Sequence, residues 1–491
     1  MSKYILSIDA GTTGITIMLF DKNAKIIKKE YAEFTQFYPK PGYVEHDPLE
    51  IWDITKKLLY EISKKYDKEI HSIGITNQRE TTIIWDKNTG SPIHNAIVWQ
   101  CKRTAEKCND LIKEGYADLI KDKTGLPISS YFSATKAQWI LENIDYSKTL
   151  LENQSLLFGT IDTWLIWNLT NRTSHATDHT NASRTMLYNI NSFEWDQELI
   201  DLFELKKIIL PDIKNSTDCF GEIDLDMFSE KIPITGVAGD QQAALFGQYG
   251  YNENDTKCTY GTGCFILTNT GKNKIDSNNG LITTIACDKN GSPIYAIEGS
   301  VFIGGAVIQW LRDEIQIIND AKETESIANS LDNNAGVYIV PSFTGLGAPY
   351  WNMESKGIIT GLTRGTNFKH LVRSSLESIA LQVNDLVNCL NNDLGYDIKK
   401  LNVDGGATEN NFLMQFQSDI SNITIQKPEN IESTALGAAL LSGIGSKYWV
   451  DINNVKNNQL NTIYQSKMEC ELRKSILKDW RNAIQQCLLT S

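Results

Sequence analysis

Two glycine- and threonine-rich stretches carry residue types that bind phosphate. The first, DAGTTG at 9–14, lies between two apolar runs at 4–8 and 15–20 that are rich in β-branched and aromatic residues. Its glycines let a ligand approach the backbone, and the Thr12 and Thr13 hydroxyls with successive N–H groups can form an anion-binding concavity. Asp9 would then face the phosphates, where a carboxylate needs an intervening cation such as Mg²⁺. An ordinary tight hairpin explains this stretch equally well when it is taken alone.

The second stretch, TYGTGCF at 259–265, repeats the order strand, Gly-Thr-Gly turn, strand. It is not a dinucleotide-binding fingerprint, because the third glycine is missing and the turn lies in a hairpin. Two similar hairpins, one opening each half of the chain, predict duplicated domains that face each other across a cleft. The composition turns polar and rich in Gly and Asn near 249–257, so we divide the chain into domains at 1–250 and 251–491.

A group of side chains in the first half is suited to a polyhydroxylated ligand. The adjacent Arg79 and Glu80 offer donors and acceptors side by side, which hydroxyl groups require because each both donates and accepts. Trp99 follows an apolar run and Tyr131 precedes a helix, and such rings pack against C–H groups while a phenol caps an oxygen. A surface ion pair and ordinary core packing are the alternative interpretations.

Asp240 follows a buried apolar strand at 232–238 and precedes the apolar helix AALFGQ. The ends of strands are where open α/β sheets bind ligands. A carboxylate there can act as a general base, which contributes about 10² to 10⁴ in rate. Capping of the helix is the alternative role.

Two glycine-rich turns in the second half favour a nucleotide. Gly304-Gly305 opens a helix, and glycines at such a position allow close approach of a flat or charged ligand. The segment VDGGATENN at 403–411 joins a strand to a helix. There Gly406 leaves room for an adenine or a ribose, and Asn410 can hydrogen-bond to it. An ordinary tight turn is the alternative for this segment.

The elements that must position these side chains follow an α/β pattern. Asp47 and Pro48 suit the N-cap and the first residue of a helix. A strand at 156–161 leads into a further helix, for which Asp162 is the predicted N-cap. The small-residue helix at 434–440 is suited to close packing between the two halves.

The overall composition excludes several classes of protein. The 491 residues carry a net charge of −13, which argues against binding nucleic acid or anionic membranes. No apolar run reaches the roughly 18 residues that span a bilayer, and the N-terminus lacks a signal pattern, so we expect a soluble intracellular protein. The nine cysteines form no CxxC pair, so zinc and redox roles are not expected. No P-loop or protein-kinase signature is present.

Taken together, these residues resemble the FGGY carbohydrate kinases, which have the actin-like (ribonuclease H-like) ATPase fold. The resemblance covers essentially the whole chain. It rests on DxGTT at 9–13, GITNQRETT at 74–82, NAIVWQCKRTAE at 95–106, FGTIDTWLIW at 158–167, TNASRTML at 180–187, AGDQQAALFGQ at 238–248, TYGTGCF at 259–265, FTGLGAPYW at 343–351 and VDGGATENNFLMQFQSDI at 403–420.

The resemblance implies two actin-like ATPase domains that phosphorylate glycerol to sn-glycerol 3-phosphate with ATP, the first step of glycerol catabolism. It also implies a cytoplasmic homodimer or homotetramer. Asp240 would be the general base and Asp9 would help to place Mg²⁺. The glycerol hydroxyls would be held by Arg79, Glu80, Tyr131, Asp240 and Gln241, and the carbon chain by Trp99 and Phe265. The nucleotide would contact Thr12, Thr13, Gly14, Thr262, Gly305, Gln309, Gly406 and Asn410.

Some positions depart from the family pattern. Relatives commonly have Gln after the first Asp and Ser-Ser-Arg after the two threonines, whereas Ala10 and Gly14-Ile15-Thr16 stand here. The missing Arg removes one charge beside the phosphates, which leaves nucleotide affinity and preference open. The loop at 218–232 lacks both the Gly/Arg-rich stretch linked to inhibition by fructose 1,6-bisphosphate and a His like the one phosphorylated in some relatives. We therefore predict that neither form of regulation operates.

Two alternatives to this function stay open. Within the enzyme class, the substrate could be another polyol or a ketose, although Trp99 and Phe265 around a small pocket favour glycerol. Outside that class, the same ATPase fold serves in chaperones and filaments, but the sequence offers no spare segment for a peptide-binding module. A non-catalytic relative is disfavoured because Asp9, Arg79, Glu80 and Asp240 are all present.

Overall fold

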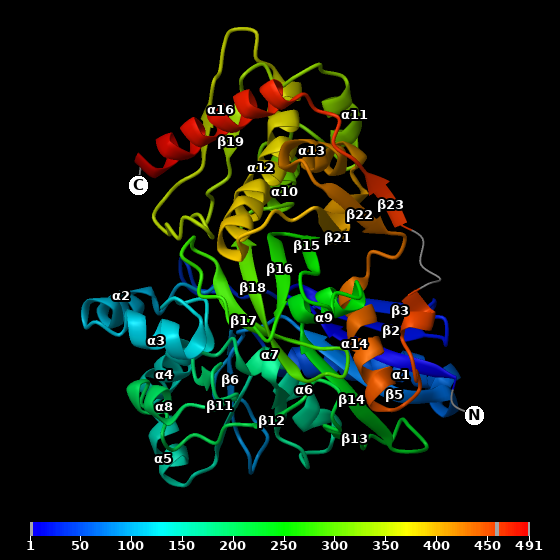
Figure 1. Ribbon diagram of the computed structural model, residues 1–491. Helices are drawn as coiled ribbons and strands as arrows, with labels where there is room; N and C mark the ends of the chain where they lie inside the picture. Colours follow the sequence, from blue (N-terminus) through cyan, green and yellow to red (C-terminus); the bar gives the residue numbers. More distant parts are fainter. Residues whose placement is uncertain (1–2, 457–460, 490–491) are drawn as a thin grey trace.

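Each half of the chain is built on one mixed β-sheet in the computed structural model, which describes residues 3–456 and 461–489 (Figure 1). The N-terminal sheet has the order β13-β14-β5-β1-β2-β3. Strands β1, β2 and β3, which come first in the chain, form an antiparallel meander, while β5 and β14 run parallel to β1. Their bounds are β1 (Tyr4–Ala10), β2 (Gly14–Phe20), β3 (Ile26–Glu33), β5 (Ile70–Asn77), β13 (Gly221–Ile223) and β14 (Ile232–Gly239).

The C-terminal sheet repeats this plan, with the order β17-β18-β16-β15-β21-β22-β23. Strands β15, β16 and β18 pair antiparallel in that order, with β17 antiparallel to β18 at the edge, and β21 and β22 run parallel to β15. The repeat confirms the prediction of two similarly built domains. Their bounds are β15 (Thr256–Tyr260), β16 (Cys264–Gly271), β17 (Ile282–Cys287), β18 (Pro293–Val301), β21 (Lys400–Asp404), β22 (Thr424–Pro428) and β23 (Asn461–Tyr464).

Helices cover the N-terminal sheet and build a second core beside it. Helix α1 (Pro48–Tyr66) begins as predicted, because the Asp47 carboxylate accepts from the Leu49 N–H and Pro48 occupies the first turn. Helix α6 (Ile161–Leu169) differs from the prediction, since Thr160 is its N-cap residue and Asp162 lies in the first turn. The helices of the second core are α2 (Ala105–Lys113), α3 (Ala117–Thr124), α4 (Ser133–Asn143), α5 (Ser147–Glu152) and α8 (Gln197–Leu202).

The C-terminal core is organised by the long helix α12 (Phe368–Leu394), which begins with a capping box between Asn367 and His370. Its buried face, from Val372 to Leu390, packs with the C-terminal sheet and neighbouring helices. Those helices are α10 (Ala306–Asp313), α11 (Glu323–Asn329), α13 (Asn411–Ser421) and α16 (Cys470–Leu489).

Helix α14 (Ser433–Gly445) crosses from the C-terminal half to pack against α9 (Asp240–Gly247) and the N-terminal strands β5 and β14 (Figure 1). Glycines permit this approach: a Cβ on Gly437 would lie 1.8 Å from the Ala243 carbonyl oxygen, and one on Gly74 would lie 2.1 Å from that of Ala438. The prediction of a small-residue helix between the halves is confirmed. The division that we predict at residue 250 falls between α9 and β15.

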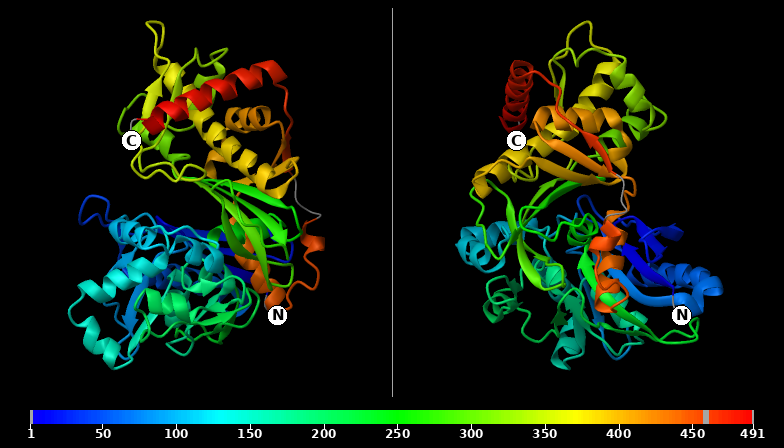
Figure 2. Two further views of the ribbon diagram at one scale, coloured as in Figure 1. Left: turned by 60° about the vertical axis from the view of Figure 1, so that its left-hand side comes forward. Right: turned by 45° about the vertical axis from the view of Figure 1, so that its right-hand side comes forward.

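Shorter elements complete the chain, and Figure 2 shows the two lobes with the strands at 256–301 running from one toward the other. Among the described residues, none of the helices combines the length and the apolar character needed to cross a membrane.

The remaining elements are β4 (Glu45–His46), η1 (Asp67–Glu69), β6 (Ile83–Asp86), β7 (Ala96–Ile97), β8 (Leu156–Gly159), β9 (Ala176–Asp178), α7 (His179–Ala182), β10 (Tyr188–Asn189), β11 (Glu194–Trp195), β12 (Asp212–Lys214), β19 (Tyr338–Val340), β20 (Ile358–Thr360), η2 (Gly406–Glu409) and α15 (Asn453–Lys456).

Candidate active site

A cavity of about 190 Å³ lies between the two glycine-rich hairpins. Thr12 and Thr13 from the turn between β1 and β2 form one side, and the turn between β15 and β16 forms the other. We call this space the polyol cavity. All seven residues predicted to hold glycerol line it, namely Arg79, Glu80, Trp99, Tyr131, Asp240, Gln241 and Phe265.

Aromatic rings form the apolar wall of the polyol cavity. The Trp99 ring meets those of Tyr131 and Phe265 edge to face, with centroids 5.6 Å and 6.3 Å away. The Trp99 Nε1 atom donates to the Thr12 hydroxyl at 3.1 Å, which fixes the indole beside the first hairpin. Such a wall suits the carbon chain of a small polyol.

A buried charge network lies behind the polar wall, to which Arg79 and Glu80 belong. Arg79 donates from both terminal nitrogens to Glu298 on β18, at 2.5 Å and 3.0 Å. Arg184 donates to Glu80 at 2.6 Å and to Glu298 at 3.0 Å. Burial by itself would raise the pKa of Glu298, but Arg184 and Arg79 hold it down at about 2. The network therefore ties the N-terminal lobe to a charged carboxylate of the C-terminal sheet.

Sequence reasoning gave no role to Arg184 or Glu298. Arg184 lies within the TNASRTML motif, so its place in a family motif was a usable signal. Glu298 lies inside an apolar strand, and a charged residue in such a run was the corresponding signal. Burial raises the pKa of Glu80, while the nearby arginines act in the opposite direction.

Asp240 and Gln241 open helix α9 at the edge of the polyol cavity. Asp240 is not the N-cap, because Gly239 occupies that position. The Arg79 Nε atom lies 3.1 Å from Asp240 Oδ1. The Gln241 Oε1 atom accepts from the Lys257 ammonium at 2.5 Å, and the same ammonium donates to Thr259 at 2.8 Å. Lys257 was also missed, since nothing local in a strand predicts a buried amine.

Asp9 lies on β1 directly before the first hairpin turn. Burial, together with the nearby carboxylates of Asp240 and Glu432, raises its pKa to about 7. A cation beside Asp9 would favour the ionised carboxylate.

A second cavity of about 600 Å³ lies in the C-terminal lobe next to the first. The two cavities share Gly261 and Thr262 of the second hairpin. Five of the predicted nucleotide residues line this nucleotide cavity: Thr262, Gly305, Gln309, Gly406 and Asn410. Thr12 and Thr13 instead line the polyol cavity.

Gly14 is not among the residues that line either cavity. It is the first residue of β2, and a Cβ there would lie 2.6 Å from the Ala32 carbonyl oxygen and 2.7 Å from the Tyr31 ring. The structure therefore gives Gly14 a packing role, and any nucleotide contact would involve its backbone.

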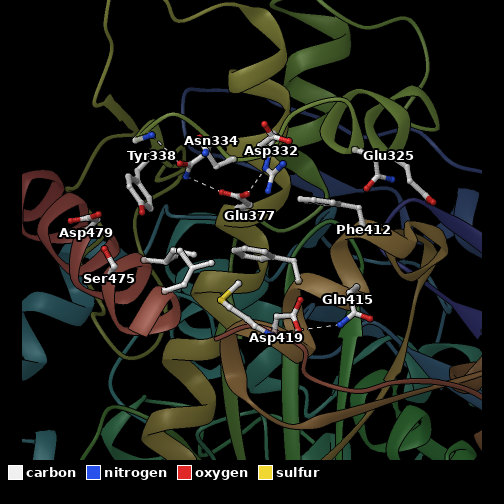
Figure 3. Close-up of a pocket in the computed structure, with 18 of the residues that line it drawn as sticks. Glu325, Asp332, Asn334, Tyr338, Glu377, Phe412, Gln415, Asp419, Ser475 and Asp479 are labelled. Atoms are coloured by element: carbon white, nitrogen blue, oxygen red, sulfur yellow. Dashed lines mark hydrogen bonds and ion pairs between the residues drawn. The ribbon is translucent and has the colours of Figure 1, made fainter. Parts of the chain in front are cut away.

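A separate cavity of about 520 Å³ lies among helices α11, α12, α13 and α16 (Figure 3). Its labelled side chains include Glu377, which accepts from Asn334, and Asp419, which accepts from Gln415. Glu325 is shared with the nucleotide cavity. No residue that we predicted for the site lines this third cavity.

Two models of one protein family match most of the chain. Residues 4–247 match the N-terminal domain, and residues 256–446 the C-terminal domain, of the FGGY family of carbohydrate kinases. The chain belongs to this family.

Individual relatives and solved structures are similar to the chain along nearly its whole length. The chain is 51% identical to the glycerol kinase of Clostridium botulinum (strain 657 / Type Ba4), over 99% of both chains. The crystal structure of Plasmodium falciparum glycerol kinase with ADP is similar at a TM-score of 0.91 and 39% identity, over 99% of both chains. Ligand-bound xylulose kinase from Lactobacillus acidophilus shares the fold at a TM-score of 0.87 and 23% identity, covering 98% of this chain and 97% of that one.

Proposed function

We propose that this chain transfers the γ-phosphoryl group of ATP to glycerol and so forms sn-glycerol 3-phosphate, the first step of glycerol catabolism. The observation that carries the proposal is the meeting of the polyol and nucleotide cavities at Thr262. Similarity to glycerol kinases along the whole chain supports the same substrates. From the family resemblance we also propose a cytoplasmic homodimer or homotetramer.

In this proposal, the polar wall holds glycerol while the aromatic wall packs its carbons. Arg79, Glu80, Tyr131, Asp240 and Gln241 contact the hydroxyls, and Trp99 with Phe265 covers the C–H groups. Asp240 takes the proton from the attacking hydroxyl as general base. Thr12, Thr13 and Thr262 lie where the transferred group passes, so positioning and electrostatics supply most of the catalysis of an in-line transfer.

The donor set fits Mg²⁺ held jointly by protein and nucleotide. Within residues 3–456 and 461–489, no group of three or more His, Cys, Asp and Glu side chains could hold a metal by itself. Mg²⁺ is usually held by one or two carboxylates together with substrate phosphates and waters. Asp9, with Asp240 nearby, supplies such carboxylates. When bound, the ion would neutralise charge on the phosphates.

Closure of the two lobes would exclude water from the junction of the cavities, because water competes with glycerol as the acceptor. The network of Arg79, Arg184 and Glu298 already links the two sheets behind the polyol cavity.

Another polyol or a ketose is the second candidate substrate, because sugar kinases such as the xylulose kinase share this fold. The small volume and the Trp99–Phe265 wall favour a three-carbon polyol. A hexitol or ketose with a higher kcat/KM than glycerol would overturn this choice.

The deciding experiment measures ADP release with and without glycerol, in the presence of Mg²⁺, for the wild type and for Asp240→Asn. Glycerol-dependent release that nearly vanishes in the variant would support both the acceptor and the base. Equal ATP hydrolysis without glycerol would contradict the acceptor and bring back the chaperone or filament alternative.

A further inference from the structure

Lys136 is fully buried in the first turn of helix α4. Burial of an ammonium group is costly, and the start of a helix is the wrong end for a cation because the helix dipole is positive there. Burial lowers the pKa of Lys136 to about 7, with the charge of Arg103 acting in the same direction and the Glu80, Cys101 and Cys108 side chains in the opposite one. Lys136 therefore does not stabilise helix α4, to which it belongs.

The contacts of Lys136 are two backbone carbonyls. Its Nζ atom donates to the Tyr131 carbonyl at 2.6 Å and to the Glu80 carbonyl at 3.3 Å. Both residues line the polyol cavity, but they come from different elements, Glu80 after β5 and Tyr131 before α4. One buried amine thus ties together the backbones of two residues that face the same ligand.

The backbone of Glu80 needs such support. Its φ angle is +61°, a left-handed conformation that is costly for a residue with a Cβ. Its carbonyl accepts from Lys136 and also from the Ser133 hydroxyl at 3.0 Å and the Thr82 hydroxyl at 3.1 Å. Donors from two different elements converge on this oxygen, which keeps the unusual conformation and directs the Glu80 carboxylate to Arg184 and the cavity.

We propose that Lys136 is a positioning residue of the polyol site, which holds the backbones of Glu80 and Tyr131 so that their side chains meet the hydroxyls of the polyol. The inference rests on the proposed function. It predicts that loss of Lys136 weakens the use of glycerol more than the use of ATP, since Lys136 does not line the nucleotide cavity.

The test compares Lys136→Met with Gln138→Met. Gln138 is a matched control because it is buried in the same helix and its amide atoms have no hydrogen-bond partner. We expect Lys136→Met to raise the KM for glycerol by about tenfold, since two buried carbonyls lose a donor. The KM for ATP should stay within about twofold, and Gln138→Met should leave both values unchanged. Lys136→Arg keeps a charged donor, so its KM for glycerol should lie between those of the wild type and Lys136→Met.

Ser133→Ala keeps the proposal testable if Lys136→Met fails to fold, because it removes another donor to the Glu80 carbonyl. It should raise the KM for glycerol by about threefold without changing that for ATP. A folded Lys136→Met with the wild-type KM for glycerol would overturn the proposal. So would an unfolded Lys136→Met combined with a wild-type KM in Ser133→Ala. A wild type without glycerol-dependent turnover would refute the proposed function instead.

Discussion

The guanidinium of Arg79 pairs with the carboxylate of Asp240 at the edge of the polyol cavity, where Arg79 Nε lies 3.1 Å from Asp240 Oδ1. The same guanidinium is held from the other lobe by two hydrogen bonds to Glu298. The position of Asp240 is therefore coupled through Arg79 to the C-terminal sheet. If Asp240 is the base that we propose, this pairing limits the reorganisation needed when a hydroxyl is placed beside it.

Asp240→Asn tests the role of the base. The amide keeps the shape of the side chain but cannot accept a proton, so we expect kcat to fall by about 10² to 10⁴. The affinity for ATP should persist, because Asp240 does not line the nucleotide cavity. Rates from coupled ADP release and nucleotide affinity from calorimetry check both parts. Retention of more than a tenth of the wild-type rate would rule out Asp240 as the base.

Glu298→Gln tests the charge network that links the lobes. Removing this charge leaves two buried guanidiniums without their shared partner, and we expect the free energy of unfolding to fall by about 3 kcal/mol. Urea denaturation measures the loss. The control is Glu471→Gln, which removes an exposed pair with Lys474 and should leave stability nearly unchanged. Equal effects of the two substitutions would show that the network is not stabilising.

Local signals in the sequence were enough to predict some of the elements but not the buried network. The Asp47-Pro48 helix start and both hairpins depend on neighbouring residues, so their patterns are legible in the chain. Arg79 and Glu298 are 219 positions apart, and no local pattern encodes such a pairing. The cap prediction for Asp162 was wrong because the helix already begins at Ile161, and the Asp162 carboxylate accepts from the hydroxyls of the nearby Thr160 and the distant Thr177.

Gln241→Glu tests which face of the Gln241 side chain meets the polyol. A lysine ammonium can only donate, so the bond from Lys257 requires that Gln241 Oε1 points to it and leaves the NH₂ group for the cavity. A carboxylate would keep the bond to Lys257 but lose the donors. We expect wild-type thermal stability and a KM for glycerol raised by about tenfold. An unchanged KM would show that the amide nitrogen does not contact glycerol.

Asp385→Asn tests a pH dependence of stability. The Asp385 carboxylate accepts from Trp480 at 2.8 Å and from Tyr350 at 2.9 Å, and burial raises its pKa from 3.8 to about 6. The native state therefore binds a proton on Asp385 more tightly than the unfolded state does. The stabilisation that this proton gives the native state is lost as pH rises from about 4 to about 6. Over this range the free energy of unfolding of the wild type should fall by about 2 kcal/mol relative to that of Asp385→Asn. If urea denaturation gave the same difference in unfolding free energy between the two proteins at both ends of the pH range, the prediction would be contradicted.

Two adjacent glycines separate a structural role from a ligand-binding role at the nucleotide cavity. Gly405 has a φ of +89°, and a Cβ there would lie 2.5 Å from the Tyr260 carbonyl oxygen. Gly405→Ala should therefore lower the free energy of unfolding by more than about 1 kcal/mol. A Cβ on Gly406 meets no protein atom within 4 Å, although this residue lines the cavity.

Gly406→Ala should accordingly leave stability within about 0.5 kcal/mol of the wild type, because its new methyl group points into open space. The KM for ATP should rise severalfold, since that space is where the adenosine would lie, while the KM for glycerol stays unchanged. Urea denaturation and steady-state kinetics on both variants make the comparison. If Gly406→Ala changed only stability, or raised the KM for glycerol instead, this turn would not be the adenosine site.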